Sequence, residues 1–182
     1  MRLASRSLYL APAHERHLAL LQSWFPDAEH ARLWGGPGIR YPFTAESFHD
    51  DLQLESVTSR ALLNDRGSLL GFGQYCRRHE RCHLMRLAIA PAHRGQGLGA
   101  RLIAALAREG GEALRVTECA LNVYPNNPAA RLYARLGFSD ATPPDGQSLD
   151  GCRYLVASVS VASRDNLEQA SLAVHKGLKN GR

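Results

Sequence analysis

The hydrophobic pattern of this 182-residue chain changes repeatedly between a period of two and a period of three to four. A period of two is typical of strands, and a period of three to four is typical of amphipathic helices. Strands are predicted at 7–11, 57–63, 69–77, 83–90, 115–122 and 153–161, with another opening at Phe138. Helices are predicted at 14–25, 44–55 and 98–108, the last ended by Gly110-Gly111, and between Asn127 and Gly137. This order favours an α/β or α+β fold, a mixed sheet flanked by helices.

A glycine-rich turn follows the strand at 83–90 and opens the next helix. Its residues are Arg94, Gly95, Gln96, Gly97, Leu98, Gly99 and Ala100. The N–H groups of such a turn and of the first helical turn lack partners inside the helix, and the helix dipole adds positive potential. Arg94 adds a charge that it cannot lose. The turn therefore predicts a site for the phosphates of a cofactor.

Three phosphate-binding patterns compete for this turn. A Walker A loop needs Gly-Lys-Ser/Thr, which the sequence lacks. A dinucleotide fingerprint fits Gly95, Gly97 and Ala100, and Glu118 lies near the expected position of the ribose-binding acid. A dinucleotide-binding fold would need several further strand–helix units after this turn, and too little chain remains for them. The third pattern, Arg-x-x-Gly-x-Gly, fits residues 94–99. A glycine turn that only caps a helix is the purely structural alternative.

The pattern at 94–99 resembles motif A of the GNAT superfamily, the GCN5-related N-acetyltransferases, whose loop holds the pyrophosphate of acetyl-coenzyme A (acetyl-CoA). Residues 126–138, Asn-Asn-Pro-Ala-Ala-Arg-Leu-Tyr-Ala-Arg-Leu-Gly-Phe, resemble motif B of the same superfamily. Asn127 and Pro128 suit the start of a helix, and Gly137 suits its end. The resemblance covers roughly residues 5–161. It implies a mostly antiparallel central sheet, splayed at the strand before the glycine-rich turn.

The resemblance also implies roles for individual residues. Backbone N–H groups of the splayed strand contact the pantetheine arm and the acetyl carbonyl, and by position they belong to Leu87, Ala88 and Ile89. Tyr133 matches the residue that protonates the departing coenzyme A, although a core aromatic is its ordinary interpretation. Asn126 matches the motif asparagine that contacts the coenzyme. Asn127 is the better helix cap, so the division of roles within this pair stays open.

The general base has three candidates. An amine acceptor must lose a proton before or during its attack on the thioester. Some family members carry a glutamate near the start of the strand at 83–90, and His83 occupies the corresponding position. A histidine titrates near pH 6.5 and could act directly or through water, or it could simply face solvent. Glu80 is the next candidate, in a turn at 77–81, and a chain of water molecules is the third.

The acceptor side is expected in the N-terminal half. Six acidic residues lie between Trp24 and Glu55, against two arginines, which favours a cationic amine; a solvated helix face is the alternative. Trp34, Tyr41 and Phe43 stand in Gly/Pro-rich segments, where exposing aromatic rings is costly, so we expect them to line a pocket. This region faintly resembles the acceptor region of aminoglycoside 6′-acetyltransferase-like members.

Composition narrows the classes of function. The net charge of +5 comes with scattered arginines, so nucleic acid is not an expected partner. The chain has no run long enough to cross a membrane and no secretion signal, and its four cysteines suggest reduced thiols and no metal site, so a cytoplasmic protein is predicted. Residues 1–161 form the predicted catalytic domain. Residues 162–182 form an extension predicted to be an amphipathic helix. Homodimers are common in the family, so a second copy of the chain is a further expected partner.

The sequence therefore predicts an N-acetyltransferase with acetyl-CoA as its cosubstrate. It would move the acetyl group to a primary amine of a small molecule or of a peptide or protein, by direct attack in a ternary complex. Two other classes stay open. One is a non-catalytic module that binds acetyl-CoA and regulates a partner, and the other is an NAD(P)-dependent oxidoreductase.

Overall fold

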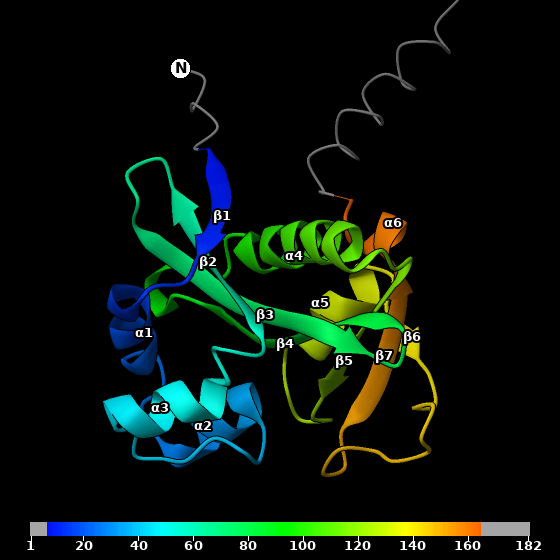
Figure 1. The fold of residues 1–182 in the computed structure, drawn as a ribbon, viewed down its shortest axis with the longest axis horizontal. Coiled ribbons are helices and arrows are strands. Elements are labelled where there is room, and N and C mark those ends of the chain that lie inside the picture. The colour runs from blue at the N-terminus through cyan, green and yellow to red at the C-terminus, as the bar shows by residue number, and fades with distance from the viewer. Residues whose placement is uncertain (1–6, 165–182) are drawn as a thin grey trace, which may run out of the picture.

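A computed structural model describes residues 7–164 and shows a seven-stranded sheet with helices on both faces (Figure 1). The strands are β1 (Leu8–Pro12), β2 (Thr58–Asn64), β3 (Leu69–Arg78), β4 (Arg81–Ile89), β5 (Glu118–Val123), β6 (Ser139–Asp140) and β7 (Arg153–Ser158). The helices are α1 (Glu15–Gln22), α2 (Ala28–Gly35), α3 (Ala45–Leu52), α4 (Leu98–Leu114), α5 (Ala130–Arg135) and α6 (Val159–Ala162), with a 3-10 turn η1 (Pro91–His93). The predicted mixed α/β fold is confirmed.

The sheet opens in its middle. The strand order is β1-β2-β3-β4-β5-β7-β6, and every neighbouring pair is antiparallel except β4 and β5. These two parallel strands pair only at Cys82 with Cys119 and at His83 with Ala120. From residue 84 to residue 89, β4 continues beside β3 but not beside β5. This is the splay that the family resemblance implied.

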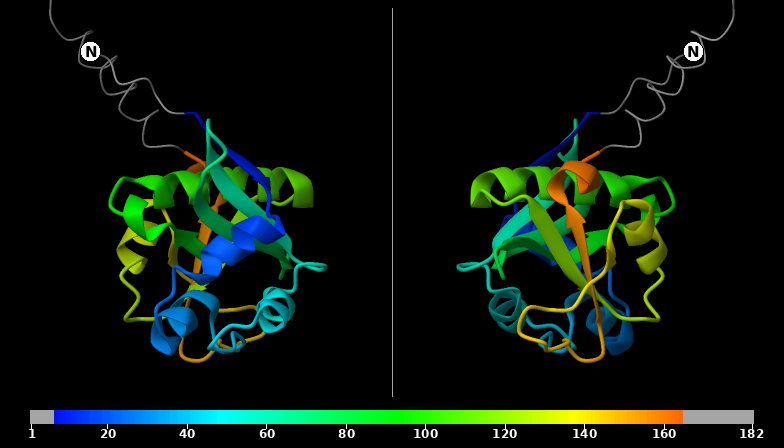
Figure 2. Two further views of the ribbon diagram at one scale, coloured as in Figure 1. Left: turned by 90° about the vertical axis from the view of Figure 1, so that its left-hand side faces the viewer. Right: turned by 90° about the vertical axis from the view of Figure 1, so that its right-hand side faces the viewer.

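Two hydrophobic clusters hold the helices against the sheet. In one, α4 packs over β3 and β4 through Leu102, Ile103 and Leu106, and α5 lies on the same face (Figures 1 and 2). In the other, α1, α2 and α3 cover the opposite face around Phe48 and Phe72. Period-two alternation along β3 explains this division, because residues an odd number of positions apart face opposite sides of a strand.

A bulge bends β4 where the sheet opens. The pairing with β3 shifts between Gln74–Met85 and Phe72–Ala88, so β4 carries one additional residue. Arg86, in this bulge, has a left-handed backbone with φ of 51°. Gly73 lies opposite, where a Cβ atom would come within 2.9 Å of Leu87 Cδ2. The bulge and the missing side chain together place residues 86–89 along the opening.

Helix α4 differs from the prediction at its end. Gly110 and Gly111 were expected to stop the helix, but α4 continues to Leu114. Both glycines are buried, and a Cβ atom at either position would collide with Cys82 or Val159 side-chain atoms. The glycine pair therefore allows close packing of the helix on its neighbours, which the sequence alone did not distinguish from a stop signal.

Two helix starts also differ from the prediction. Helix α2 was not predicted; its cap is Asp27, whose carboxylate accepts the His30 N–H at 2.9 Å. Helix α5 begins at Ala130 rather than just after Asn127. The Asn127 side chain accepts the Ala129 N–H at 2.9 Å and so closes the turn that leads into the helix.

The described part of the chain includes α6 but ends at Arg164, so the predicted C-terminal helix lies outside it. Within residues 7–164, no helix is both long enough and apolar enough to cross a membrane.

Candidate active site

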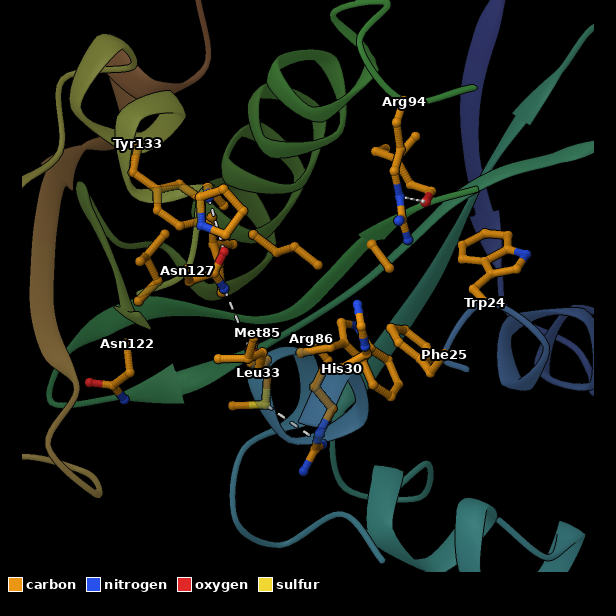
Figure 3. A pocket seen from close by; sticks show the side chains of 18 residues that line it. Trp24, Phe25, His30, Leu33, Met85, Arg86, Arg94, Asn122, Asn127 and Tyr133 are labelled. Carbon is orange, nitrogen blue, oxygen red and sulfur yellow. Dashed lines mark hydrogen bonds between the residues drawn. The ribbon is translucent and has the colours of Figure 1, made fainter. Parts of the chain in front are cut away.

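A cleft follows the opening between β4 and β5, and it has two lobes that share Leu33, Trp34, Leu84, Met85, Arg86 and Asn122. We call one the first lobe; it continues past Leu87, Ala88, Ile89, Arg94, Asn127 and Tyr133. We call the other the second lobe; it continues along 35–38, Gln53, Arg78, His83, Tyr124, Leu149 and Cys152. Figure 3 shows Tyr133 and Asn127 on one side of the first lobe and Arg94 across from them.

The glycine-rich turn stands at the outer end of the first lobe. Gly95 and Gly97 have φ of 73° and 76°, and no atom lies within 4 Å of where a Cβ would be. Gly97 is the cap of α4, and the first N–H bonded back to it belongs to Arg101. The N–H groups before Arg101 therefore remain free of intrahelical partners and are open to an anion.

Arg94 links this turn to the opened strand. Its Nε donates to the Ile89 carbonyl oxygen at 3.2 Å, and the side chain is otherwise exposed. The guanidinium therefore lies where β4 ends and the glycine-rich turn begins. An arginine in this place suits a diphosphate that remains partly hydrated.

The remaining predicted residues of the turn have structural contacts. Gln96 donates to the Ala92 carbonyl at 3.4 Å, and Leu98 is half-buried at the start of α4. Ala100 packs in the core of the α4 face. Gly99 lies so close to α5 that a Cβ atom would be 2.9 Å from Leu132 Cδ2. This close approach positions α5, and with it Tyr133, beside the turn.

Tyr133 is 8% exposed and lines the first lobe from α5. Its ring packs edge-on against Phe138, with 6.0 Å between centroids. Burial raises the pKa of the Tyr133 hydroxyl to about 12. The hydroxyl therefore keeps its proton at neutral pH and has one to donate.

The two asparagines before α5 are separated by the fold. Asn127 lines the first lobe, and its Nδ2 donates to the Leu33 carbonyl at 3.5 Å, joining the start of α5 to α2. Asn126 is exposed and lines neither lobe. The geometry thus favours Asn127 at the cleft, although the motif resemblance pointed to Asn126.

His83 lies at the last paired position before the splay and is 3% exposed. Burial lowers its pKa to about 3, so the expectation that it titrates near pH 6.5 is wrong. A solvent-facing position is equally wrong. Its Nε2 lies 3.5 Å from Asn122 Nδ2, and its Nδ1 has no partner among residues 7–164. Glu80 lines neither lobe; it is exposed in its turn and bonds Arg77 at 2.9 Å.

The three predicted acceptor aromatics do not all line the cleft. Trp34 belongs to α2, not to a loop, stacks on Phe25 with 4.2 Å between centroids, and lines both lobes. Tyr41 donates its hydroxyl to the Pro26 carbonyl at 2.9 Å. Phe43 packs against Phe48. Neither Tyr41 nor Phe43 lines a lobe of the cleft. These two rings belong instead to an aromatic cluster that also includes Phe25, Phe48 and Trp34.

The sequence profile of the acetyltransferase (GNAT) family matches residues 18–138, which include both lobes' strands and the glycine-rich turn. The chain belongs to this family. The resemblance stated from motifs A and B is thereby confirmed. Family membership supports the predicted acetyl-CoA-dependent N-acetyltransferase activity.

Solved structures have the same fold as this GNAT chain. Spermidine N-acetyltransferase from Vibrio cholerae, in complex with CoA and spermine, is 16% identical with a TM-score of 0.65, over 86% of this chain and 98% of that one. The aminoglycoside acetyltransferase AAC(6')-Ib, in complex with coenzyme A, is 23% identical with a TM-score of 0.63, over 88% and 99%. At these identities the likeness establishes the fold.

The cleft residues of this GNAT protein that the sequence did not predict include Arg86, Asn122 and Tyr124. Arg86 interrupts an apolar strand, which is the one signal that could have marked it. Its place in the cleft depends on the bulge, and the bulge is not visible in the pattern. Tyr124 donates its hydroxyl to Asp150 at 2.8 Å and lies under the Arg32 guanidinium at 4.7 Å, through partners distant in sequence.

Proposed function

We propose that the protein transfers an acetyl group from acetyl-CoA to a primary amine of a small molecule or a peptide, by direct attack in a ternary complex. The observation that carries this proposal is the first lobe itself. It brings the unpaired part of β4, the glycine-rich turn with Arg94, and the protonated Tyr133 to one opening.

Each part of the opening has a chemical task. The N–H groups at the α4 start and Arg94 would bind the diphosphate. Residues 87–89 would bind the pantetheine arm along the open strand edge and polarise the acetyl carbonyl. The amine nitrogen forms a bond to the acetyl carbon, the carbon–sulfur bond breaks, and the departing thiolate takes a proton from Tyr133. The amine nitrogen loses a proton to water, and water passes a proton to the Tyr133 phenolate, which restores the hydroxyl.

Water is the proposed acceptor of the amine proton. His83 remains neutral at neutral pH but is too weakly basic to remove that proton efficiently, because its pKa is about 3. Glu80 is exposed and ion-paired outside the cleft. Asn122 instead lines both lobes, and neutral His83 lies beside it in the second lobe.

A thermal-shift comparison followed by a turnover assay tests the proposal. We expect acetyl-CoA and coenzyme A to raise the melting temperature, and NAD and NADP to leave it unchanged. Release of free thiol from acetyl-CoA in the presence of an amine panel would then demonstrate transfer. Stabilisation by acetyl-CoA without thiol release on any amine would favour the regulatory-module alternative, and stabilisation by NAD alone would favour the oxidoreductase.

A cytoplasmic location and a homodimer are part of the same proposal. They rest on the sequence composition and on the frequency of dimers in the family. Light scattering of the full chain would measure the mass, and a monomer at micromolar concentration would contradict the dimer.

A further inference from the structure

The second lobe carries positive side chains and no negative ones. Arg78 and Arg86 line it, together with apolar, amide and glycine residues and the neutral His83. No Asp or Glu among residues 7–164 lines either lobe. This distribution is unexpected for a site that would take polycations.

Arg86 is held in place without a carboxylate partner. Its Nη1 donates to Gln74 Oε1 at 2.8 Å and to the Leu52 carbonyl at 3.4 Å, both neutral acceptors. Its Nε is buried and has no acceptor in the described chain. Burial lowers the pKa of Arg86, yet a guanidinium stays charged at neutral pH. Among residues 7–164 the guanidinium charge therefore has neutral hydrogen-bond partners only, and an anion that reached it from the cleft would form a charge-assisted pair.

Acids that interact with residues of the lobe or line the adjoining pocket have other partners; Asp145, for one, lies 3.6 Å from His79. Asp51 attracts Arg86, but its carboxylate bonds Arg40 at 2.8 Å. Asp150 accepts from Tyr124 and pairs with Arg32 at 3.4 Å. Of the acids among residues 24–55 that suggested a cationic acceptor, Asp50 and Asp51 share Arg40, and none lines either lobe.

Gln74 fixes the direction of the Arg86 side chain. Gln74 is fully buried, and its Nε2 donates to the Leu52 carbonyl and to Ser59 Oγ, both at 2.8 Å. Its Oε1 is thereby turned toward Arg86. The guanidinium is held by β3 and by the end of α3, at the part of the cleft that both lobes share.

We propose that the amine acceptor carries an anionic group, a carboxylate or a phosphate, which pairs with Arg86 in the second lobe while the amine reaches the opening beside His83 and Asn122. Charge-assisted hydrogen bonds to a fixed guanidinium favour such an acceptor. Arg78, exposed at the end of β3, adds attraction at longer range. A polyamine would instead meet like charge. This inference rests on the proposed acetyl transfer and narrows its acceptor.

Binding to the coenzyme A-saturated protein tests the inference by calorimetry with matched pairs of amines. Lysine and cadaverine differ by a carboxylate, and O-phosphoethanolamine and ethanolamine differ by a phosphate. We expect the anionic member of at least one pair to bind about tenfold or more tightly than its partner. The pair that discriminates identifies the anion.

Substitutions locate the effect. Arg86→Gln should lower the affinity for the preferred anionic amine by about tenfold or more. The affinity for the matched amine without the anionic group, cadaverine or ethanolamine, should not change. Arg78→Gln should have a smaller effect, of about twofold to threefold, because it is exposed. Arg66→Gln, in the exposed turn between β2 and β3, is the matched control and should change nothing.

Three outcomes decide the matter. Cadaverine and ethanolamine binding as tightly as their partners would overturn the inference, and so would the absence of binding by every amine. Preference for an anionic amine without thiol release would support the anion site and contradict acetyl transfer instead. The wild-type comparison does not depend on the folding of any variant, and coenzyme A binding by Arg86→Gln checks that this variant is folded.

Discussion

Arg94 and Arg86, two of the arginines that line the cleft, are held in opposite ways. Arg94 is exposed on the glycine-rich turn and has a single carbonyl partner, whereas Arg86 is half-buried in a bulge and bonded by a buried glutamine. An exposed guanidinium gains little from any one anion, because water competes for both. A buried one discriminates strongly, because leaving it unpaired is costly. We therefore expect the first lobe to bind its cosubstrate through several weak contacts, and the second lobe to bind its ligand through one selective contact.

The largest expected effect is on chemistry in the first lobe. Tyr133→Phe keeps the buried ring and deletes its acidic proton. We expect kcat to fall about 10²-fold or more, with coenzyme A affinity nearly unchanged. Steady-state kinetics on an active acceptor, together with calorimetry, measure both. As a control, Tyr154→Phe removes a buried hydroxyl outside the two lobes. Full turnover in the Tyr133 variant would remove this hydroxyl from the mechanism.

The next effect concerns the backbone of the turn. Gly97→Val should weaken acetyl-CoA binding by about tenfold to a hundredfold, because φ of 76° disfavours a β-branched residue and its methyl groups would fill the phosphate approach. Gly146→Val is a matched control, since Gly146 has φ of 71°, the same open surroundings, and a place outside both lobes. Equal loss of the acetyl-CoA thermal shift in both variants would mean that strain, not ligand approach, explains it.

A smaller effect is expected at Arg94. Arg94→Gln should weaken coenzyme A binding by about tenfold, the value of a charge-assisted hydrogen bond, and should make binding less dependent on salt. Pantetheine, which lacks the diphosphate, should bind to the wild type and to the variant with equal affinity. A similar loss for pantetheine would place Arg94 in the wall of the lobe rather than at the diphosphate.

The smallest effect is on stability as a function of pH. Unfolded His83 binds a proton below about pH 6.5, whereas folded His83 does so only near pH 3, because burial lowers its pKa to about 3. The unfolded state therefore binds more protons in that window. The contribution of His83 to the free energy of unfolding should reach its maximum above about pH 7. It should decline as the pH falls from about 6.5, by at most about 1.4 kcal/mol per pH unit.

His83→Gln should flatten this decline in urea unfolding measured from pH 4 to 8, and His49→Gln, at a half-exposed histidine, should not. The same His83 variant should leave the shape of the kcat/KM profile between pH 6 and 8 unchanged. A lost limb near pH 6.5 would return His83 to the role of base.

The glycine-rich turn and the start of α5, which border the first lobe, could be predicted because their signals are local. In the turn at 94–100 and the segment at 126–138, the glycines, caps and charges act on their own stretch of chain, so their roles do not depend on the rest of the fold. The second lobe combines residues 33–38, 78–86 and 149–152, which the fold alone brings together. Arg86 reaches the cleft through a bulge, and Tyr41 and Phe43 are drawn into an aromatic core that their loop composition did not reveal.

Because β4 pairs with β5 only at residues 82 and 83, one edge of β4 has no neighbouring strand from residue 84 to residue 89. An unpaired strand edge attracts other strands and is usually protected. An extended ligand bearing amide groups would complete the ladder, much as an added peptide strand does. Amide hydrogen exchange at residues 84–89 should then slow when acetyl-CoA binds, while β2 and β3 change little. The cosubstrate would thus serve as a removable element of secondary structure as well as an acetyl donor.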